Sequence, residues 1–457
     1  MRREKEKMKI GDEVMAFKKL HGVHVPHRKN TAGAATVTMD PPSVVTIPVS
    51  MHIGAPAKPL VKAGDLVTVG QRIAEVGGFV SSPVHASVSG KVKKIDEMLN
   101  SQGRKVPVIT IESDGQMTRC PDLKPPVIND TEDFLQAMTD SGIVGLGGAG
   151  FPTSVKLRIK DLSKIEAVIV NGAECEPYIT SDTRTMVENP KLVIAGAKML
   201  QKYIGVKRVI FAIEDNKPEC ISSLESLCQG EEGLEVASLP SLYPQGGEKV
   251  IIYHTIGKVV PEGKLPLDAG AIVINCTTLA SIARYVKYGI PLVKKCVTVD
   301  GSAVKNPKNV VVPIGTSLED VFNFCGGFKA EPKKVLYGGP MMGIAVPDLT
   351  QPILKNTNAI LAFAEDDARL PAPSACIKCG RCIAHCPFSL QPCEIESAFE
   401  RKDVEAMAAL KVNICMECGC CSFICPASRP LVQTNKLAKP MVMAYLKEKQ
   451  EKEAAKK

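Results

Sequence analysis

Apolar and polar positions divide the middle of the chain into alternating strands and helices. Short continuous apolar runs, which are typical of buried parallel strands, alternate with longer segments whose apolar residues recur at helical spacing. The expected strands are Ala167–Val170, Arg208–Ile213 and Ala271–Ile274, and the expected helices are Thr131–Asp140, Lys191–Tyr203 and Leu279–Tyr288. Residues 116–290 are therefore predicted to form a Rossmann-like α/β domain.

Two other regions contain short β-type runs separated by glycine turns. Residues 41–115 have two similar halves that meet at residues 77–83, which resembles the barrel-sandwich fold of biotinyl and lipoyl carrier domains. Carriers place a modified lysine at the hairpin tip. The tip here, residues 78–82, has no lysine, so we expect a structural or docking role. Residues 291–345, with a strand at 310–314 and a helix at 317–324, predict a small β-grasp, SLBB-like domain.

The remaining segments are shorter, and together the parts predict a multidomain protein of α/β and β type with a helical C-terminal module. Residues 1–40 are expected to be an irregular arm, 346–365 a linker, and 446–457 a charged tail. Residues 366–445 are expected to be helical, with one amphipathic helix over residues 394–410.

Three histidines in the arm, His21, His24 and His27, have a spacing that can ligate a metal. Gly22 and Pro26 favour a loop instead, and no cysteine or carboxylate completes a site.

Composition and charge exclude few functions. The chain has 457 residues, a net charge of +8 and no tryptophan, and it contains no nucleic-acid-binding motif. The charged ends are interpreted as solvated tails, with docking to an acidic partner or an anionic membrane surface as the alternative. Because the N-terminus lacks an apolar signal core and no apolar stretch could span a bilayer, we expect a cytoplasmic protein that other subunits would hold at a membrane.

The C-terminal region contains two cysteine runs with the same spacing. Each run reads C-x2-C-x2-C-x3-C-P, the pattern of bacterial two-cluster ferredoxins, in which the fourth cysteine ligates the other cluster. The expected ligands are Cys376, Cys379, Cys382 and Cys425 for one [4Fe–4S] cluster, and Cys386, Cys415, Cys418 and Cys421 for the second.

Zinc binding and disulfides are the alternatives for these cysteines. Zinc usually takes pairs of cysteines rather than matched quartets that end in proline, and disulfides need an oxidising compartment. Cys393 and Cys420 lie outside the pattern and are interpreted as spare thiols.

A glycine-rich segment, G-L-G-G-A-G-F-P-T-S-V-K, spans residues 145–156. Its glycines let backbone N–H groups approach a phosphate, and Lys156 adds positive charge. The match to G-x-G-x-x-G is weak because a helix rather than a strand precedes it, and a tight turn remains the alternative. Three polar clusters just past strand ends, at 171–178, 243–249 and 275–278, strengthen the nucleotide interpretation, since ligands of α/β sheets bind at the carboxyl ends of strands.

A nucleotide beside two single-electron clusters contributes to electron transfer only if it also exchanges single electrons. Flavin exchanges a hydride with NAD(H) on one side and single electrons on the other. The sequence therefore predicts a flavoprotein that passes electrons between NAD(H), flavin, two iron–sulfur clusters and a protein partner.

Residues 145–156, 171–177, 243–249 and 275–281 resemble, in order and spacing, the FMN- and NADH-binding subunit of respiratory complex I. Together with the double cysteine run and with residues 22–30, 82–90 and 338–343, they resemble the C subunits of Rnf complexes over nearly the whole chain. The resemblance implies the NAD(H)-reacting, peripheral subunit of an Rnf complex on the cytoplasmic face of the cell membrane. Such a complex is a ferredoxin:NAD+ oxidoreductase that translocates Na+ or H+. The implied partners are other Rnf subunits, including membrane subunits and an iron–sulfur subunit that accepts electrons from ferredoxin.

The resemblance also implies the residues of a non-covalent FMN site and of an NAD(H) site beside it. The flavin loop and its phosphate end would be Gly145, Gly147, Gly148, Gly150 and Lys156. The residues lining the flavin and its ribityl chain would be Asn171, Glu174, Tyr243, Gly246, Asn275 and Thr278. Phe151 would stack on the nicotinamide cofactor, with Glu176 and Glu248 nearby. No catalytic acid or base is implied, because hydride transfer depends mainly on positioning.

Two positions depart from the complex I pattern. Ala173 and Gly247 replace acidic residues, and two cysteine quartets replace the single one of complex I's flavin subunit. One competing function is a soluble flavin iron–sulfur reductase related to cobalamin or proline reductase systems, and the N-terminal position of the barrel-sandwich domain argues against the cobalamin type. Another is a relay without nucleotide binding, against which the intact glycine loop, Lys156 and Glu248 argue.

Overall fold

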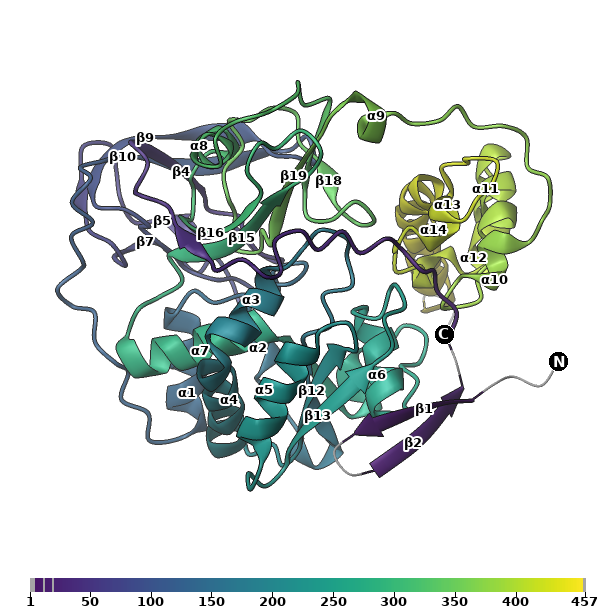
Figure 1. The fold of residues 1–457 in the computed structure, drawn as a ribbon, viewed down its shortest axis with the longest axis horizontal. Helices are drawn as coiled ribbons and strands as arrows, with labels where there is room; N and C mark the ends of the chain where they lie inside the picture. The colour runs from purple at the N-terminus through teal and green to yellow at the C-terminus, as the bar shows by residue number, and fades with distance from the viewer. Residues whose placement is uncertain (1–4, 11–12, 19, 455–457) are drawn as a thin grey trace.

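The computed structural model describes residues 5–10, 13–18 and 20–454. They form an α/β domain, a barrel-sandwich domain, a β-grasp domain and a helical C-terminal module, which the chain reaches by an extended connection (Figure 1). The multidomain α/β and β architecture predicted from the sequence is confirmed.

The α/β domain is built on four parallel strands in the order β14-β11-β12-β13. The strands are β11 (Ala167–Asn171), β12 (Val209–Glu214), β13 (Leu234–Leu239) and β14 (Ala271–Asn275). The helices are α1 (Thr131–Asp140), α2 (Thr153–Lys156), α3 (Ser181–Glu188), α4 (Pro190–Met199), α5 (Pro218–Cys228), α6 (Glu248–Ile256) and α7 (Cys276–Tyr288). The central strands are buried on both faces, which explains their continuous apolar sequences.

The N-terminal arm is more regular than expected. Strands β1 (Lys5–Ile10) and β2 (Glu13–Lys18) form an antiparallel hairpin that extends the sheet beside β13, and β3 (Val37–Thr38) pairs with the β-grasp domain. The prediction of an irregular arm over residues 1–40 is wrong at these strands, because an edge strand forms by pairing with a distant sheet and not by local pattern. Residues 20–36 do lack helix and strand, and they run between the domains towards the helical module (Figure 1).

The barrel-sandwich domain consists of two facing sheets, β4-β10-β9-β6 and β5-β7-β8. Their strands are β4 (Val44–Pro48), β5 (Lys58–Pro59), β6 (Leu66–Val67), β7 (Arg72–Glu75), β8 (Val84–His85), β9 (Gly90–Leu99) and β10 (Lys105–Ser113). At the hairpin tip Phe79 is 75% exposed, where a carrier would have its lysine.

The β-grasp sheet has the order β18-β17-β19-β15-β16-β3. Its elements are β15 (Lys294–Asp300), β16 (Lys308–Pro313), α8 (Leu318–Phe324), β17 (Lys334–Tyr337), β18 (Ile344–Ala345) and β19 (Ala359–Phe363). Strand β19 is fully buried between β17 and β15, so the segment 346–365 is part of this domain and not a linker. The connection to the next module begins after α9 (Glu365–Ala368).

The C-terminal module contains α10 (Arg381–Ala384), α11 (Pro392–Glu400), α12 (Val404–Ala409), α13 (Cys420–Phe423) and α14 (Leu431–Ala454). The single helix predicted over 394–410 is two helices. Lys402 adopts a left-handed conformation, and the Asp403 side chain caps α12 by accepting from the Ala406 N–H at 2.9 Å. The charged tail continues α14 as far as residue 454. Among the described residues, no helix is both long and apolar enough to cross a membrane.

Buried Lys355 ties three segments of the structure together. Its Nζ donates hydrogen bonds to Ser82 Oγ (3.1 Å) and Pro83 O (2.6 Å) in the barrel-sandwich domain and to Gly142 O (2.7 Å) after α1. Lys355 itself lies in the β-grasp domain, on the segment between β18 and β19. The ammonium group thus satisfies carbonyl groups that the junction would otherwise bury without partners.

We expect Lys355→Met to lower thermal stability, because the two carbonyl groups lose their buried donor. The cost should be on the order of 2–4 kcal/mol. Differential scanning fluorimetry would measure it, with Lys333→Met as the control, because Lys333 is exposed and forms a surface ion pair with Glu331. Equal unfolding temperatures for the two variants would contradict a stabilising role for Lys355.

Candidate functional site

The carboxyl ends of β11 and β14 bring the predicted polar clusters together. Asn171 and Asn275 are direct register partners on these neighbouring parallel strands. Asn275 Oδ1 caps α7 by accepting from the Thr278 N–H at 3.1 Å. The Thr278 hydroxyl in turn accepts from the Leu146 N–H at 2.9 Å, which fixes the glycine-rich loop above the helix. The loop and both strand ends therefore form one site.

Two glycines of this loop differ in what surrounds the position of a side chain. A side chain at Gly147 would come within 2.5 Å of the Asn275 amide nitrogen, so only glycine lets the loop lie against Asn275. Gly148 faces open space, with no atom within 4 Å of the place where a Cβ would lie. The loop is closed by the Gly145 N–H, which donates to the Phe151 carbonyl at 2.9 Å. Phe151 itself is partly exposed.

Lys156 and Glu248 lie at the mouth of the site. Lys156 Nζ is 3.2 Å from Glu248 Oε1 and donates to the Val273 carbonyl at 2.9 Å. The two side chains are 32% and 44% exposed, so the pair is accessible to solvent and to a ligand. Asn171 Nδ2 donates to the Gly246 carbonyl at 2.9 Å, which joins the segment before α6 to the same site.

Glu176 faces the β-grasp domain. Its carboxylate accepts from the backbone N–H groups of Met341 (3.0 Å) and Met342 (2.8 Å). A side chain at Gly339 would come within 2.2 Å of Glu176 Oε2, which explains the glycine in the 338–343 motif. Burial raises the pKa of Glu176 to about 7, against the opposing effect of the two N–H groups.

The contacts of Glu174 differ from the expected role of lining the flavin. Its carboxylate accepts from the N–H groups of Asp182 (2.6 Å) and Thr183 (3.2 Å) and from the Thr183 hydroxyl (2.5 Å) at the start of α3. Burial raises its pKa. Both carboxylate oxygens are thus engaged by α3, and the geometry favours a role for Glu174 in shaping the loop over direct contact with a ligand.

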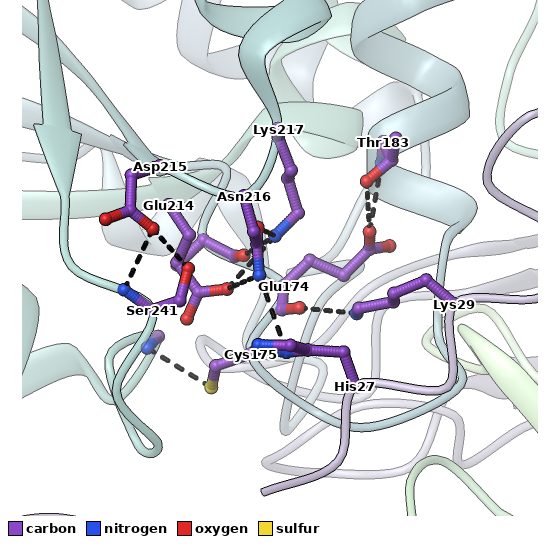
Figure 2. A network of polar contacts seen from close by, with 12 residues as sticks. His27, Lys29, Glu174, Cys175, Thr183, Glu214, Asp215, Asn216, Lys217 and Ser241 are labelled. Atoms are coloured by element: carbon purple, nitrogen blue, oxygen red, sulfur yellow. Dashed lines mark hydrogen bonds and ion pairs between the residues drawn. The ribbon is translucent and has the colours of Figure 1, made fainter. Parts of the chain in front are cut away.

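Two ammonium groups hold the backbone of this loop (Figure 2). Lys29 Nζ donates to the Glu174 carbonyl at 2.7 Å, the contact that Figure 2 shows. It also donates to the carbonyls of Glu176 (2.9 Å) and Ile179 (2.5 Å). Lys217 Nζ donates to the Ala173 carbonyl (2.6 Å) and forms a buried ion pair with Glu214 at 3.1 Å. Because Lys29 comes from the N-terminal arm and Lys217 from the segment after β12, the loop is fixed from both sides.

The eight predicted cluster ligands line two cavities in the C-terminal module. One cavity is lined by Cys376, Cys379, Cys382 and Cys425, with Cys393 beside them. The other is lined by Cys386, Cys415, Cys418 and Cys421, with Cys420 beside them. The fold therefore groups the thiols as the crossed pattern predicts, with the fourth cysteine of each run in the cavity of the other.

The two cavities differ in their surroundings. Cys376 and Cys379 are exposed, whereas Cys415, Cys418 and Cys421 are buried. Nitrogen donors also point at sulfur in the buried set: the Glu417 N–H (3.4 Å) and Asn435 Nδ2 (3.5 Å) approach Cys415 Sγ.

The buried cavity lies against the strand-end site. The Tyr243 hydroxyl donates to the Cys418 carbonyl at 2.7 Å, and Tyr243 is only 2% exposed. A side chain at Gly247 would come within 2.3 Å of the Met416 methyl group, which shows how closely the two parts pack. Among the site residues, Tyr243 thus connects the α/β domain to the cysteine module.

Family models match three parts of the chain. The Nuo51 FMN-binding domain matches residues 138–284, the RnfC barrel sandwich hybrid domain residues 16–116, and the SLBB domain residues 296–345. The chain is 44% identical over 384 residues to the C subunit of the Na(+)-translocating ferredoxin:NAD(+) oxidoreductase complex of Acetobacterium woodii, covering 83% of this chain and 87% of that relative. The chain belongs to the family of Rnf C subunits.

Two other relatives support the same family membership. The C subunit of the proton-translocating ferredoxin:NAD(+) oxidoreductase complex of Clostridium ljungdahlii is 41% identical over 397 residues, which are 86% of each chain. The C subunit of the ion-translocating oxidoreductase complex of Rhodobacter capsulatus is 36% identical over 427 residues, covering 92% of this chain and 82% of that one. The predicted membership of the Rnf family is confirmed, and the barrel-sandwich, FMN-binding and SLBB domains that the sequence predicted are those that the family models match.

No sequence pattern pointed to the residues whose side chains hold Asn275 and the backbone of the 173–179 loop in place. Lys29 lay inside a motif recognised by resemblance, but nothing local reveals that it reaches a loop far along the chain. Lys217 and Asp182 carried no motif signal. Each acts through contacts between segments that only the fold brings together.

We expect Lys29→Met to loosen the 173–179 loop, because three carbonyl groups lose their buried donor. Hydrogen–deuterium exchange should show faster exchange over residues 172–183. The matched control is Lys62→Met, which removes an exposed lysine of the barrel-sandwich domain. Unchanged protection of this segment in Lys29→Met would exclude Lys29 as its clamp.

Proposed function

We propose that this chain is the NAD(H)-reacting peripheral subunit of an Rnf complex, a ferredoxin:NAD+ oxidoreductase whose partner subunits translocate Na+ or H+. It would lie on the cytoplasmic face of the cell membrane and exchange electrons with an iron–sulfur subunit that accepts them from ferredoxin. Two features support this proposal: the family membership, and the packing of the strand-end site against a cysteine cavity through Tyr243 and Cys418.

The strand-end site suits FMN. The loop 145–150 offers backbone N–H groups and an open face at Gly148, and Lys156 supplies a cation beside it. Asn171, Gly246, Asn275 and Thr278 would surround the flavin and ribityl chain, with Tyr243 beneath. Bound flavin supplies the step between hydride transfer and single-electron transfer.

The nicotinamide cofactor would enter at the exposed mouth of the site. Phe151 would provide a stacking surface, and Glu248 and Glu176 would flank it. The residues of this chain need to hold the nicotinamide against the flavin and exclude water, because positioning accounts for most of the catalysis of a hydride transfer.

The cysteine cavities suit two [4Fe–4S] clusters, since each offers four thiols in the ferredoxin pattern. We infer from the burial of the cysteines which cluster would be next to the flavin. The cavity of Cys386, Cys415, Cys418 and Cys421 would be next to the flavin, and that of Cys376, Cys379, Cys382 and Cys425 would face the protein partner, because two of its thiols are exposed.

Cofactor analysis of the anaerobically purified chain is the direct test. We expect about eight iron, eight acid-labile sulfide and one FMN per chain, as two cubanes and one flavin require. Eight iron without flavin, even after incubation with FMN, would leave a two-cluster relay and remove the NADH-oxidising role.

Lys156→Ala should weaken FMN binding at least about tenfold, because it removes the accessible cation of the strand-end site, while both clusters remain. Fluorescence titration with FMN measures the affinity. Lys160→Ala is the control, because Lys160 is exposed on the same segment. Full flavin affinity in Lys156→Ala would show that the phosphate end lies elsewhere.

Cys382→Ala should damage one cluster and leave reduction of the flavin by NADH intact, because Cys382 lines the cavity farther from the strand-end site. Electron paramagnetic resonance and stopped-flow absorbance would follow the two events separately. Loss of both clusters together with flavin reduction would contradict the proposed independence.

Tyr243→Phe should slow cluster reduction severalfold while flavin reduction by NADH is unchanged, because the hydroxyl that joins the two sites is lost and the ring is kept. Stopped-flow absorbance resolves the two steps, with Tyr288→Phe, an exposed tyrosine on α7, as the control. If cluster reduction keeps its normal rate in Tyr243→Phe, the link through Cys418 does not carry the electron path.

A further inference from the structure

A polar cavity of about 100 Å³ lies at the junction of the α/β and β-grasp domains. Its walls come from α3, α7, β15, β16, the N-terminal arm and Leu146 of the glycine-rich loop. None of the loop glycines lines it, and neither do Lys156, Asn171 or Gly246. The cavity is therefore separate from the proposed flavin site, although it touches the back of the same loop.

Lys295 on β15 lines this cavity and is only 2% exposed. Its ammonium group makes one hydrogen bond to another described residue, to the Leu146 carbonyl at 3.3 Å. An ammonium group has three donors, and burying donors without acceptors is costly. Burial accordingly lowers the pKa of Lys295, with Asp182 partly opposing the effect. An acceptor inside the cavity would satisfy the remaining donors.

Two further cations line the same cavity, Arg284 on α7 and Lys294 on β15. Neither side chain forms an ion pair or hydrogen bond with another residue in the described part of the chain. Burial and the nearby Arg119 lower the pKa of Lys294, as expected for a cation among cations.

The carboxylate in the lining does not balance this charge. Glu188 Oε1 already accepts from the Arg184 guanidinium at 2.7 Å and from the Thr36 N–H at 2.8 Å. Of the three cations, Lys295 is buried, Lys294 is half-buried and Arg284 is exposed. The Asp182 carboxylate, which opposes the shift of Lys295, accepts hydrogen bonds from Asn275 Nδ2 (2.7 Å) and Thr277 Oγ1 (2.6 Å) and forms no ion pair with Lys295 among the described residues. An anion beside Lys295 would be attracted strongly at the reduced dielectric of a buried position.

Size and geometry restrict the ligand. Sites for drug-sized molecules and cofactors usually have volumes of about 300–1,000 Å³, so this cavity is too small for a nucleotide. It has room for a compact anion, and a guanidinium beside ammonium groups suits the several oxygens of a tetrahedral oxyanion. We propose that the cavity binds a small oxyanion of the phosphate class, held by Lys295, Arg284 and Lys294. This proposal does not depend on the proposed electron-transfer function.

The test is calorimetric titration of the full chain with inorganic phosphate, at constant ionic strength and with FMN at saturating concentration. Saturation with FMN blocks any binding of phosphate at the flavin's own phosphate position. We expect one phosphate site per chain. Arg284→Gln should bind phosphate at least tenfold more weakly, and it should fold normally because Arg284 is exposed. Lys295→Met should also abolish binding, and its fold is checked by circular dichroism.

The matched control is Lys287→Gln, which removes a charge from the same helix, α7, outside the cavity lining. It should bind phosphate as the wild type does. Equal affinities in the wild type and in Arg284→Gln would overturn the proposal, and so would equal losses in Arg284→Gln and Lys287→Gln, which indicate a general charge effect. Binding that disappears when FMN is added would assign the phosphate to the flavin site and also overturn it.

Discussion

The backbone of the 173–179 loop depends on two buried ammonium groups. Four of its carbonyl groups turn towards Lys29 and Lys217, and without those donors they would be buried and unpaired. This loop meets α3 through Glu174, the β-grasp domain through Glu176, and the segment before α6 through Cys175, whose sulfur accepts from the Gly246 N–H at 3.3 Å. The same contacts that satisfy its polar groups therefore set the relative positions of three parts of the protein.

Residues 20–36 of the N-terminal arm are essential to this arrangement although they contain no helix or strand. They supply Lys29 to the loop, pair Val23 with Tyr243, and place Thr31 in a hydrogen-bonded group with Thr180 and Asn309. An irregular segment can be as well fixed as a strand when its polar groups meet partners on several domains.

The sequence predicted the parts of the fold that local pattern determines. The apolar runs of β11, β12 and β14 marked the sheet, and the polar residues after them marked the edge at which Asn171 and Asn275 lie side by side. The cysteine spacing predicted which thiols gather in each cavity. Two errors arose where distant contacts decide, since the β1–β2 hairpin pairs with β13 and β19 inserts between β15 and β17. The break in the predicted helix over 394–410 is instead local, because Asp403 caps α12 three residues ahead. Lys29, Lys217 and Lys295 were missed because their roles come from partners more than forty residues away.

The connection between α9 and the cysteine module has a consequence for how that module meets the α/β domain. Residues 369–373 are exposed, and the module contacts the α/β domain through Cys418 with Tyr243 and through Lys411 with Glu262. A short tether keeps such a partner at an effective concentration on the order of millimolar, so even a weak interface is occupied most of the time. The contacts of Tyr243 with Cys418 and of Glu262 with Lys411 therefore position the module without having to supply the affinity that two separate proteins would need.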